Sequence, residues 1–529
     1  MDRLSMDPLH TDRTTLLTQL AQARRYDVAV IGGGATGLGV ALDAASRGLS
    51  VVLVESHDFA KGTSSRATKL VHGGVRYLAQ GNISLVREAL HERSALLRNA
   101  PHLAQPLPFL LPAYQAWKLP FYGIGLKAYD LLAGRERLKA SAMMGAAAVR
   151  KFSPGVNAQG LRGGIEYWDG QFDDARLALA LARTAARHGA LLVNYCAATE
   201  LRYENDRVAG LRCVDKETGI FYDIDAGCVV NATGVWVDDL RLKDGQATHH
   251  EAAPMVAPSQ GVHVVVDRKF WPGEHALLVP SSDGRVLFAV PWLGKVLLGT
   301  TDAPRQDLPE EPKAADVDVD FILREAARYL VDAPTRADVL SVWAGLRPLI
   351  KPTAGAAGAT KKISREHTIE LSASGLVTVS GGKWTTYRAM AEDVLTRCIE
   401  AKLVKDESPC KTADLPLVGS PSFDTPRVPL SASPGLHLYG NEAAMVQSLP
   451  GADRMLCPGL SEAMVRFAAR FEYARTVEDV LARRSRLLFL DAKQALAVAP
   501  AVADILREEL GVDPGQAAFE ALARAYLVA

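Results

Sequence analysis

A glycine-rich turn near the N-terminus constrains the fold of this chain more than any other feature. Residues 27–31 (Asp-Val-Ala-Val-Ile) form a short β-branched run, which is typical of a buried parallel strand. This run leads directly into residues 32–37 (Gly-Gly-Gly-Ala-Thr-Gly), then an apolar helical stretch, then a second apolar run at 50–54 that precedes Glu55. The order predicts a strand–turn–helix–strand unit that binds a dinucleotide.

Three glycines and one acid of this unit have separate expected roles. Gly32 permits the tight turn, Gly34 lets the backbone approach a pyrophosphate, and Gly37 lets the helix lie close to the strand. Glu55 can accept hydrogen bonds from the adenosine ribose hydroxyls. Because FAD and NAD both contain such a dinucleotide, the motif alone does not choose between them.

Two downstream turns favour FAD. Residues 229–234 (Val-Val-Asn-Ala-Thr-Gly) are a strand that runs into a small-residue turn, of a kind that flavoproteins place against the dinucleotide. Residues 380–387 (Ser-Gly-Gly-Lys-Trp-Thr-Thr-Tyr) form a second strand–glycine–helix turn, which a simple doubly wound NAD dehydrogenase does not need. A flavin does need one, because amides at a helix N-terminus can stabilise negative charge on its reduced ring. We therefore predict that the chain binds FAD.

A third segment, residues 63–77, is dense in hydroxyls, glycines and cations and is too polar to be core. With residues 345–349 (Gly-Leu-Arg-Pro-Leu) and the turn at 381–387, it resembles the FAD-dependent glycerol-3-phosphate dehydrogenases, which share a fold with the D-amino-acid-oxidase-like flavoproteins. The resemblance runs from about residue 26 to the C-terminal end, and it also includes residues 291–292, 299–302 and 483–491.

The resemblance implies a fold and an activity. We expect an α/β chain in which an FAD-binding Rossmann-type domain is interleaved with an antiparallel substrate sheet and followed by a C-terminal helical domain. The expected boundaries are an N-terminal extension at 1–25, the catalytic unit at 26–395 and the helical domain at 396–529. The implied reaction is oxidation of sn-glycerol 3-phosphate to dihydroxyacetone phosphate by hydride transfer to FAD, with the electrons passed to a membrane quinone.

The residues expected to contact FAD all lie in the turns described above or in the polar segment. They are Gly32, Gly34, Gly37, Glu55, Thr63, Ser64, Ser65, Thr68, Gly234, Gly382, Lys383 and Thr385. The six cysteines are scattered without a C-x-x-C pair or a metal-ligand spacing, so we expect reduced thiols and no metal.

Oxidation of a secondary alcohol needs a base for the hydroxyl proton, and histidine is the apt group near neutral pH. Our first candidate is His72, which lies between a polar strand and two glycines. The alternative is that His72 only packs against the cofactor. The second candidate is His263, although its apolar strand at 262–266 favours a core histidine instead.

A phosphate dianion needs cations, and arginine is the favoured partner. Arg347 interrupts an apolar run at 342–350, where an unpaired charge would be costly, so it requires either an internal carboxylate or a ligand. We favour the ligand and count Arg347 among the catalytic candidates with His72 and His263. The expected substrate-binding set is Arg76, Tyr77, Arg347, Arg365 and Lys383, of which Lys383 can also serve the flavin.

Strand signals at 261–266, 285–290 and 295–298 alternate in the way that suits an antiparallel substrate sheet. After a stretch rich in proline and serine at 415–434, helical periodicity at 478–491 and 501–510 predicts a helical cap.

Net charge and hydropathy indicate whether the chain could bind nucleic acid or a membrane. The formal net charge is +0, so no global field attracts nucleic acid. Residues 1–25 lack the apolar core of a secretory signal, and no run of 18 apolar residues predicts a transmembrane helix. Residues 117–139 mix aromatic and basic side chains, which predicts either a surface that lies on anionic lipid or a solvated helix. We expect a cytoplasmic protein, peripheral to the inner face of the cytoplasmic membrane, and leave self-association open.

Three other functions compete with the quinone-linked dehydrogenase. A glycerol-3-phosphate oxidase would use oxygen, but no extra segment of the oxidase kind separates the catalytic unit from the cap. A flavoprotein without turnover, acting as a scaffold or sensor, would not need His72, Arg76, Arg347 and Lys383 together. An NAD dehydrogenase is disfavoured by the second glycine turn.

Overall fold

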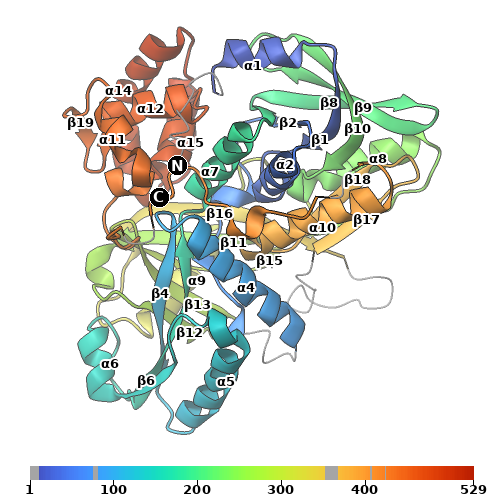
Figure 1. Cartoon of the computed structure of the whole chain (residues 1–529). Helices are drawn as coiled ribbons and strands as arrows, with labels where there is room; N and C mark the ends of the chain where they lie inside the picture. The colour runs from blue at the N-terminus through green and yellow to red at the C-terminus, as the bar shows by residue number, and fades with distance from the viewer. Residues whose placement is uncertain (1–10, 76–81, 352–366, 406–407, 423–424, 529) are drawn as a thin grey trace.

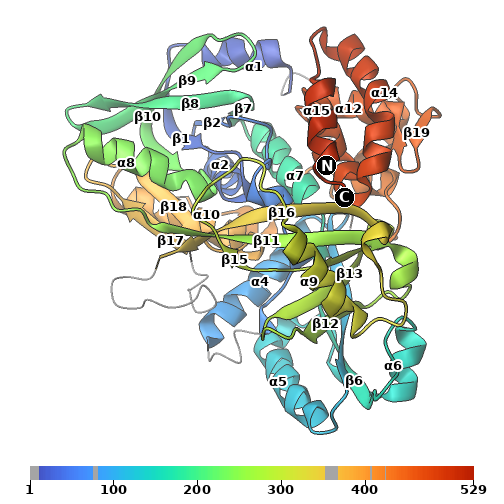
Figure 2. The ribbon, with the colours of Figure 1, turned by 180° about the vertical axis from the view of Figure 1, so that it is seen from behind.

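The computed structural model describes residues 11–75, 82–351, 367–405, 408–422 and 425–528. Two sheets lie one above the other, and the C-terminal helices stand beside both of them, as the two opposite views agree (Figures 1 and 2). Arg76, Tyr77 and Arg365 of the predicted site lie outside the described residues.

The first sheet contains the predicted dinucleotide unit. Its parallel strands follow the order β18 (Val377–Gly381), β10 (Phe221–Asn231), β1 (Arg25–Ile31), β2 (Val51–Val54) and β7 (Leu191–Val193). Strand β2 and the end of β1 are buried without interruption, as their apolar runs predict for a sheet covered on both faces. Strand β17 (His367–Leu371) pairs antiparallel with β18, and the hairpin of β8 (Cys196–Glu204) and β9 (Arg207–Asp215) extends from β10.

Helices α2 (Ala35–Arg47) and α10 (Tyr387–Glu400) pack against each other beside this sheet. They meet at Gly39, where a Cβ would lie 3.0 Å from the Tyr387 ring. Because α10 keeps a buried face along its length, it runs without a break through the predicted domain boundary at 395/396. The boundary expected at 395/396 therefore falls inside α10, which ends at Glu400.

The second sheet is the expected antiparallel one, and its long strands β11 (Val256–Asp267) and β16 (Val339–Ile350) pair along almost their whole length. The three predicted strand signals are confirmed as parts of β11, β13 (Val286–Trp292) and β14 (Lys295–Gly299). These strands pair antiparallel in the order β11-β14-β13. The remaining strands of this sheet are β3 (Leu70–Val71), β4 (Ala104–Ala113), β5 (Ala142–Gly145), β6 (Gly163–Phe172), β12 (Ala276–Pro280) and β15 (Ala303–Pro304).

Helices connect and cover the two sheets. The described α-helices that precede the C-terminal part, other than α2 and α10, are α1 (Arg13–Leu20), α4 (Ile83–Asn99), α5 (Lys118–Ala133), α6 (Ala146–Phe152), α7 (Asp174–Arg187), α8 (Val237–Ala247) and α9 (Asp316–Ala327). None of the helices in the described ranges is both long enough and apolar enough to cross a membrane.

The C-terminal part is helical, as predicted, apart from a short strand pair formed by β19 (Met455–Cys457) and β20 (Leu460–Ser461). Its helices are α11 (Ala443–Gln447), α12 (Glu462–Phe471), α13 (Leu487–Leu490), α14 (Ala492–Leu510) and α15 (Gln516–Arg524). The predicted helical signal at 478–491 is only partly right. A π-helical turn at Asp479–Arg484 is separated from α13 by Arg486, whose φ of 63° breaks the helix.

The apolar core of the C-terminal helices continues onto the second sheet. Leu488 and Val480 of the C-terminal part belong to the same buried cluster as Trp343 of β16 and Trp292 of β13. The C-terminal part is therefore packed on the sheet that is expected to carry the substrate, and we call it the cap.

Candidate active site

The first glycine turn is built by close backbone approach. A Cβ at Gly37 would lie 2.0 Å from the carbonyl oxygen of Gly32, and one at Gly32 would lie 2.6 Å from that of Ala232. A Cβ at Gly34 would contact only Ser64 among the described residues, at 3.2 Å from its Oγ. Gly34 is also the N-cap of α2 and provides no side-chain cap. The backbone at Gly34 thus carries no side chain at the position where a pyrophosphate is expected to approach the helix N-terminus.

The polar segment at Thr63–Ser65 lies against this helix N-terminus. Ser64 Oγ accepts a hydrogen bond from the Ala35 amide at 2.9 Å, and the Ser64 carbonyl accepts one from Trp384 Nε1 at 2.8 Å. Thr63 Oγ1 donates to the Leu346 carbonyl of β16 at 2.6 Å. These bonds bring together the first glycine turn, the polar segment, the second glycine turn and the substrate sheet, as the FAD prediction requires.

The second glycine turn closes the same junction. Gly382 has a φ of 72°, and a Cβ there would lie 2.4 Å from Met390 Sδ, so only glycine fits. The turn leads into a 3-10 turn at Trp384–Thr386, in which Thr385 Oγ1 accepts a hydrogen bond from the His72 amide at 3.3 Å. Ser380 Oγ donates to the Gly234 carbonyl at 3.3 Å, which brings the third predicted FAD turn to this place.

Glu55 lies at the end of β2, as predicted. Its carboxylate accepts hydrogen bonds from the Gly33 amide at 2.7 Å and the His57 amide at 2.8 Å. The carboxylate therefore holds the glycine turn itself, and its side chain keeps 15% exposure through which a ribose could reach it.

His263 is buried in the substrate sheet. Its Nε2 lies 3.0 Å from Thr68 Oγ1, and its ring stacks on Trp343 with the ring centres 4.2 Å apart. Burial, followed by the charges of Arg347 and Lys69, holds the pKa of His263 well below its usual value. The ring is therefore neutral near neutral pH, and its Nδ1 has no hydrogen-bond partner among the described residues.

Arg347 has the internal partner that the sequence left as the less favoured alternative. Its guanidinium contacts Asp302 Oδ1, Thr300 Oγ1 and the Thr301 carbonyl, each at 3.1 Å. The side chain retains 22% exposure, so Arg347 is only partly buried. An ion pair and a ligand contact are compatible at this position.

Sequence patterns missed a buried ionic cluster under the polar segment. Lys69 Nζ contacts Asp174 Oδ2 at 2.6 Å and the Ser65 carbonyl at 2.8 Å, and Arg486 contacts the same two residues at 3.1 and 2.8 Å. Burial lowers the pKa of Lys69 to about 7, although Asp174 opposes the shift. Ser65, predicted to contact FAD, presents its backbone carbonyl to these cations and its hydroxyl to the Gly62 carbonyl. No local pattern could have revealed the cluster, because its members come from distant segments.

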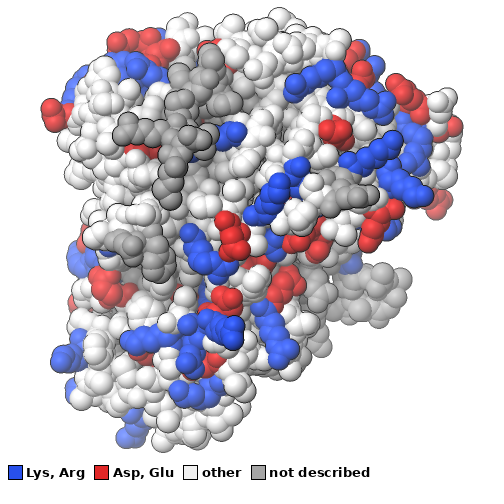
Figure 3. Space-filling model, in the orientation of Figure 1, with Lys and Arg blue, Asp and Glu red and all other residues white. Residues whose placement is uncertain are grey.

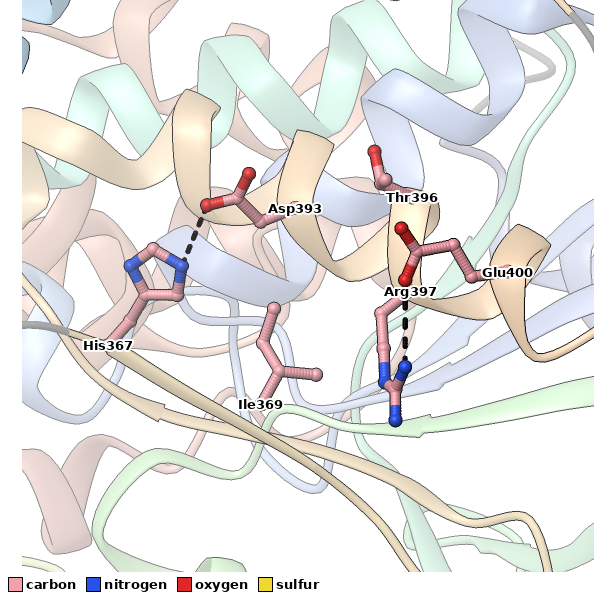
Figure 4. A pocket seen from close by; sticks show the side chains of 6 residues that line it. All are labelled: His367, Ile369, Asp393, Thr396, Arg397 and Glu400. Atoms are coloured by element: carbon pink, nitrogen blue, oxygen red, sulfur yellow. Dashed lines mark ion pairs between the residues drawn. The ribbon is translucent and has the colours of Figure 1, made fainter.

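An open hollow on the surface is not part of this junction (Figure 4). It lies between β17 and α10, and two ion pairs, His367–Asp393 at 2.9 Å and Arg397–Glu400 at 3.5 Å, satisfy its charged groups. None of the described candidate residues lines it. Within the described ranges, no group of three or more histidine, cysteine or acidic side chains could hold a metal ion.

Comparison with protein families gives two matches along the chain. The family described as "FAD dependent oxidoreductase" matches residues 27–388, which is more than half of the chain. The family described as "C-terminal domain of alpha-glycerophosphate oxidase" matches residues 410–517. Residues 389–409, which lie between the two matches, contain most of α10.

Individual proteins are similar over nearly the whole chain. A probable mitochondrial glycerol-3-phosphate dehydrogenase of Caenorhabditis elegans is 42% identical over 94% of this chain and 72% of its own length. The human mitochondrial glycerol-3-phosphate dehydrogenase is 41% identical over 95% of this chain and 73% of its own length. A solved glycerol-3-phosphate dehydrogenase from Bacillus halodurans, complexed with FAD, matches with a TM-score of 0.76 and 29% identity over 98% of each chain.

Proposed function

Because the chain belongs to the family of FAD-dependent glycerol-3-phosphate dehydrogenases, we propose that it oxidises sn-glycerol 3-phosphate to dihydroxyacetone phosphate and delivers the electrons to a membrane quinone. The observation that carries the proposal is the junction at which the two glycine turns, the polar segment at Thr63–Ser65 and β16 meet. Bound FAD would supply the acceptor for the hydride that leaves carbon 2 of the substrate.

The proton of the substrate hydroxyl needs a base, and we assign this role to His72. Its backbone is fixed to Thr385 in the second glycine turn, and its side chain is half-buried, so it can face a substrate at the junction. His263 is the second candidate. Its buried, neutral ring beside Thr68 is suited to accept a hydrogen bond, but burial limits its access to a substrate.

The two histidines can be separated by kinetics. His72→Asn should slow flavin reduction by about 10²–10⁴-fold and remove the acidic limb of its pH profile, because the titrating base is gone. His263→Asn is the matched variant. Anaerobic stopped-flow reduction measures this step, and a His72→Asn protein within a few-fold of the parent would move the role to His263.

The phosphate of the substrate needs positive charge and hydrogen-bond donors. We assign the charge to Arg347 and Lys383, with Arg76 and Arg365, and a donor to Tyr77; Arg76, Tyr77 and Arg365 lie outside the described residues. The partial exposure of Arg347 supports this role, because Asp302 and Thr300 hold the guanidinium in place while 22% of the side chain remains accessible. A planar guanidinium held in this way suits a phosphate dianion.

An acceptor-dependent assay tests the function and its closest alternative together. We expect glycerol 3-phosphate to drive rapid reduction of a quinone analogue and only slow consumption of oxygen by the same preparation. Equal rates with oxygen would instead support an oxidase, and no reaction with either acceptor would support an FAD-binding protein without turnover.

The surface of α5 supports a peripheral membrane contact. Trp117, Phe121, Ile124 and Leu131 expose between 62% and 82% of their surface. Basic side chains predominate at this lower end of the molecule, over α5 and α6 (Figure 3). We assign this aromatic and basic face to anionic lipid on the inner side of the cytoplasmic membrane. Co-sedimentation with anionic vesicles, but not with neutral ones, is the expected result, and Phe121→Glu should weaken it.

A further inference from the structure

A buried carboxylate, which the proposed reaction does not use, holds the turn that carries His72. Asp169 of β6 is 2% exposed. Its Oδ1 accepts hydrogen bonds from the Gly73 amide at 3.3 Å and from Arg93 Nη1 of α4 at 3.0 Å. Its Oδ2 accepts one from the Tyr129 hydroxyl of α5 at 2.8 Å. One carboxylate therefore joins the residue after His72 to two helices.

The side chains around Gly73 are packed too closely for a side chain to fit at this position. A Cβ at Gly73 would lie 2.4 Å from the Tyr129 hydroxyl and 2.6 Å from Leu90 Cδ2. Tyr129 and Leu90 also share a small buried cluster with Val86, on which Val75 of the same turn packs. The Tyr129 hydroxyl thus lies against the turn and also donates a hydrogen bond to Asp169, which holds the turn.

The Tyr129 hydroxyl is held in its protonated form, in which it can donate this hydrogen bond. Burial, followed by the neighbouring charge of Asp169, holds the pKa of Tyr129 well above its usual value. The hydroxyl therefore stays protonated and donates to the carboxylate, while Arg93 supplies the compensating positive charge.

We propose that Asp169 and Tyr129 are positioning residues for the turn at residues 72–74. They fix the backbone of Gly73 and thereby the direction of the His72 side chain toward the substrate. Because Tyr129 lies on α5, its hydrogen bond to Asp169 connects the turn at residues 72–74 to the helix whose outer face is exposed. The inference rests on the proposed function only where it concerns the substrate.

A small displacement of a catalytic group has a large kinetic effect, since reacting atoms must be held within a fraction of an ångström. Tyr129→Phe removes one hydroxyl and leaves the ring, the carboxylate and Arg93 in place. We expect the rate of flavin reduction to fall by about 10-fold, with a smaller change in KM. Asp169→Asn, which also removes the charge opposite Arg93, should have the larger effect.

Tyr329→Phe is the matched control. Tyr329 follows α9 and is 8% exposed, and its hydroxyl donates to the Pro280 carbonyl of β12 at the same distance of 2.8 Å, away from the turn. If loss of a buried hydrogen bond were merely destabilising, both variants would lose similar thermal stability and keep similar kinetics. A positioning role predicts the kinetic defect in Tyr129→Phe alone.

Amide hydrogen exchange of the FAD-loaded protein tests the inference without any reaction. The Gly73 amide should exchange about 10-fold faster in Tyr129→Phe than in the parent or in Tyr329→Phe, because its acceptor is less firmly held. Unchanged exchange at Gly73 would overturn the inference. Faster exchange in Tyr129→Phe, together with a parent protein whose flavin glycerol 3-phosphate does not reduce, would sustain the positioning role and refute the proposed function.

Discussion

The dinucleotide end and the interface with the cap are both central to this molecule, but they are held together by different physical means. At the dinucleotide end, backbones approach so closely that Gly32 and Gly37 cannot carry a side chain. At the cap interface, fully buried charges meet. Asp58, which follows β2 by a few residues, pairs with Arg483 and Arg484 of the cap.

The cap interface contains further buried ion pairs. They are Arg486–Asp174 at 3.1 Å, Arg176–Glu472 at 2.9 Å and Arg183–Glu442 at 2.6 Å. Moving such charges out of water costs several kcal/mol for each ion, and the pairing only offsets that cost while every partner remains. The interface therefore depends on each charge being present, whereas the glycine turn depends on each side chain being absent.

This difference predicts whether a substitution should change cofactor binding or the stability of the fold. A change at the glycine turn should remove the cofactor and spare the fold, and a change at the cap interface should weaken the fold and spare the cofactor site. Each of the following predictions would break or sharpen this contrast.

The largest effect is expected at Gly34. Gly34→Val places a branched side chain where the pyrophosphate must approach, while the close described neighbour of a Cβ there is Ser64 Oγ at 3.2 Å. The variant should fold with parental circular dichroism and contain no bound FAD. Gly125→Val is the control, because a Cβ there has no described neighbour within 4 Å. A full flavin complement in Gly34→Val would refute the cofactor assignment.

Removing one partner of the cap interface should have the next largest effect. Asp58→Asn leaves Arg483 and Arg484 buried with less negative charge, and breaking such a pair typically costs about 3–5 kcal/mol. The free energy of unfolding, measured with guanidinium, should fall by this order while FAD stays bound under native conditions. A protein of parental stability would show that the interface does not depend on its ion pairs.

Arg347 tests the contrast between the two regions, because it is ion-paired like the cap arginines but partly exposed. Arg347→Ala should lower kcat/KM for glycerol 3-phosphate by about 10- to 100-fold, corresponding to the loss of roughly 1.5–3 kcal/mol from a charge-assisted phosphate contact. Turnover of glycerol, which lacks the phosphate, should hardly change. Equal losses with both substrates would give Arg347 the structural role of the cap arginines.

The smallest effect is expected in the pH dependence of stability under acidic conditions. Burial alone would raise the pKa of Glu478, but Arg483 and Lys61 outweigh it and lower this pKa from 4.5 to about 2. Because the folded-state pKa is depressed, the stabilisation is present above pH 4.5 and is lost as the pH falls toward about 2. The stability difference between the parent and Glu478→Gln should shrink over this window. A difference that is constant with pH would contradict the contribution of the ion pair.

The sequence predicts the dinucleotide end well because its determinants are local. Residues 27–37 and Glu55 lie within one continuous stretch, and β1, α2 and β2 form where the apolar pattern and the glycine spacing place them. The antiparallel sheet is also predicted, since each of its strand signals contains its own alternation. The bond from Ala35 to Ser64 joins residues 29 positions apart and could not be inferred from either residue.

The cap interface escapes prediction for the opposite reason. Asp58 and Arg484 are 426 positions apart, and nothing near either residue identifies the other. The helical period at 478–491 indicates a helix, but it does not show that Arg486 must break that helix to reach Asp174. Arg347 lies between these cases, because its local apolar context reveals the need for a partner without identifying Asp302.

Anaerobic titration of the purified, FAD-loaded protein with glycerol 3-phosphate tests the central claim most directly. The account predicts that the visible flavin absorbance is bleached and that dihydroxyacetone phosphate forms in an amount equal to the flavin reduced. A purified protein without flavin, or a bound flavin that stays oxidised in excess glycerol 3-phosphate, would contradict it.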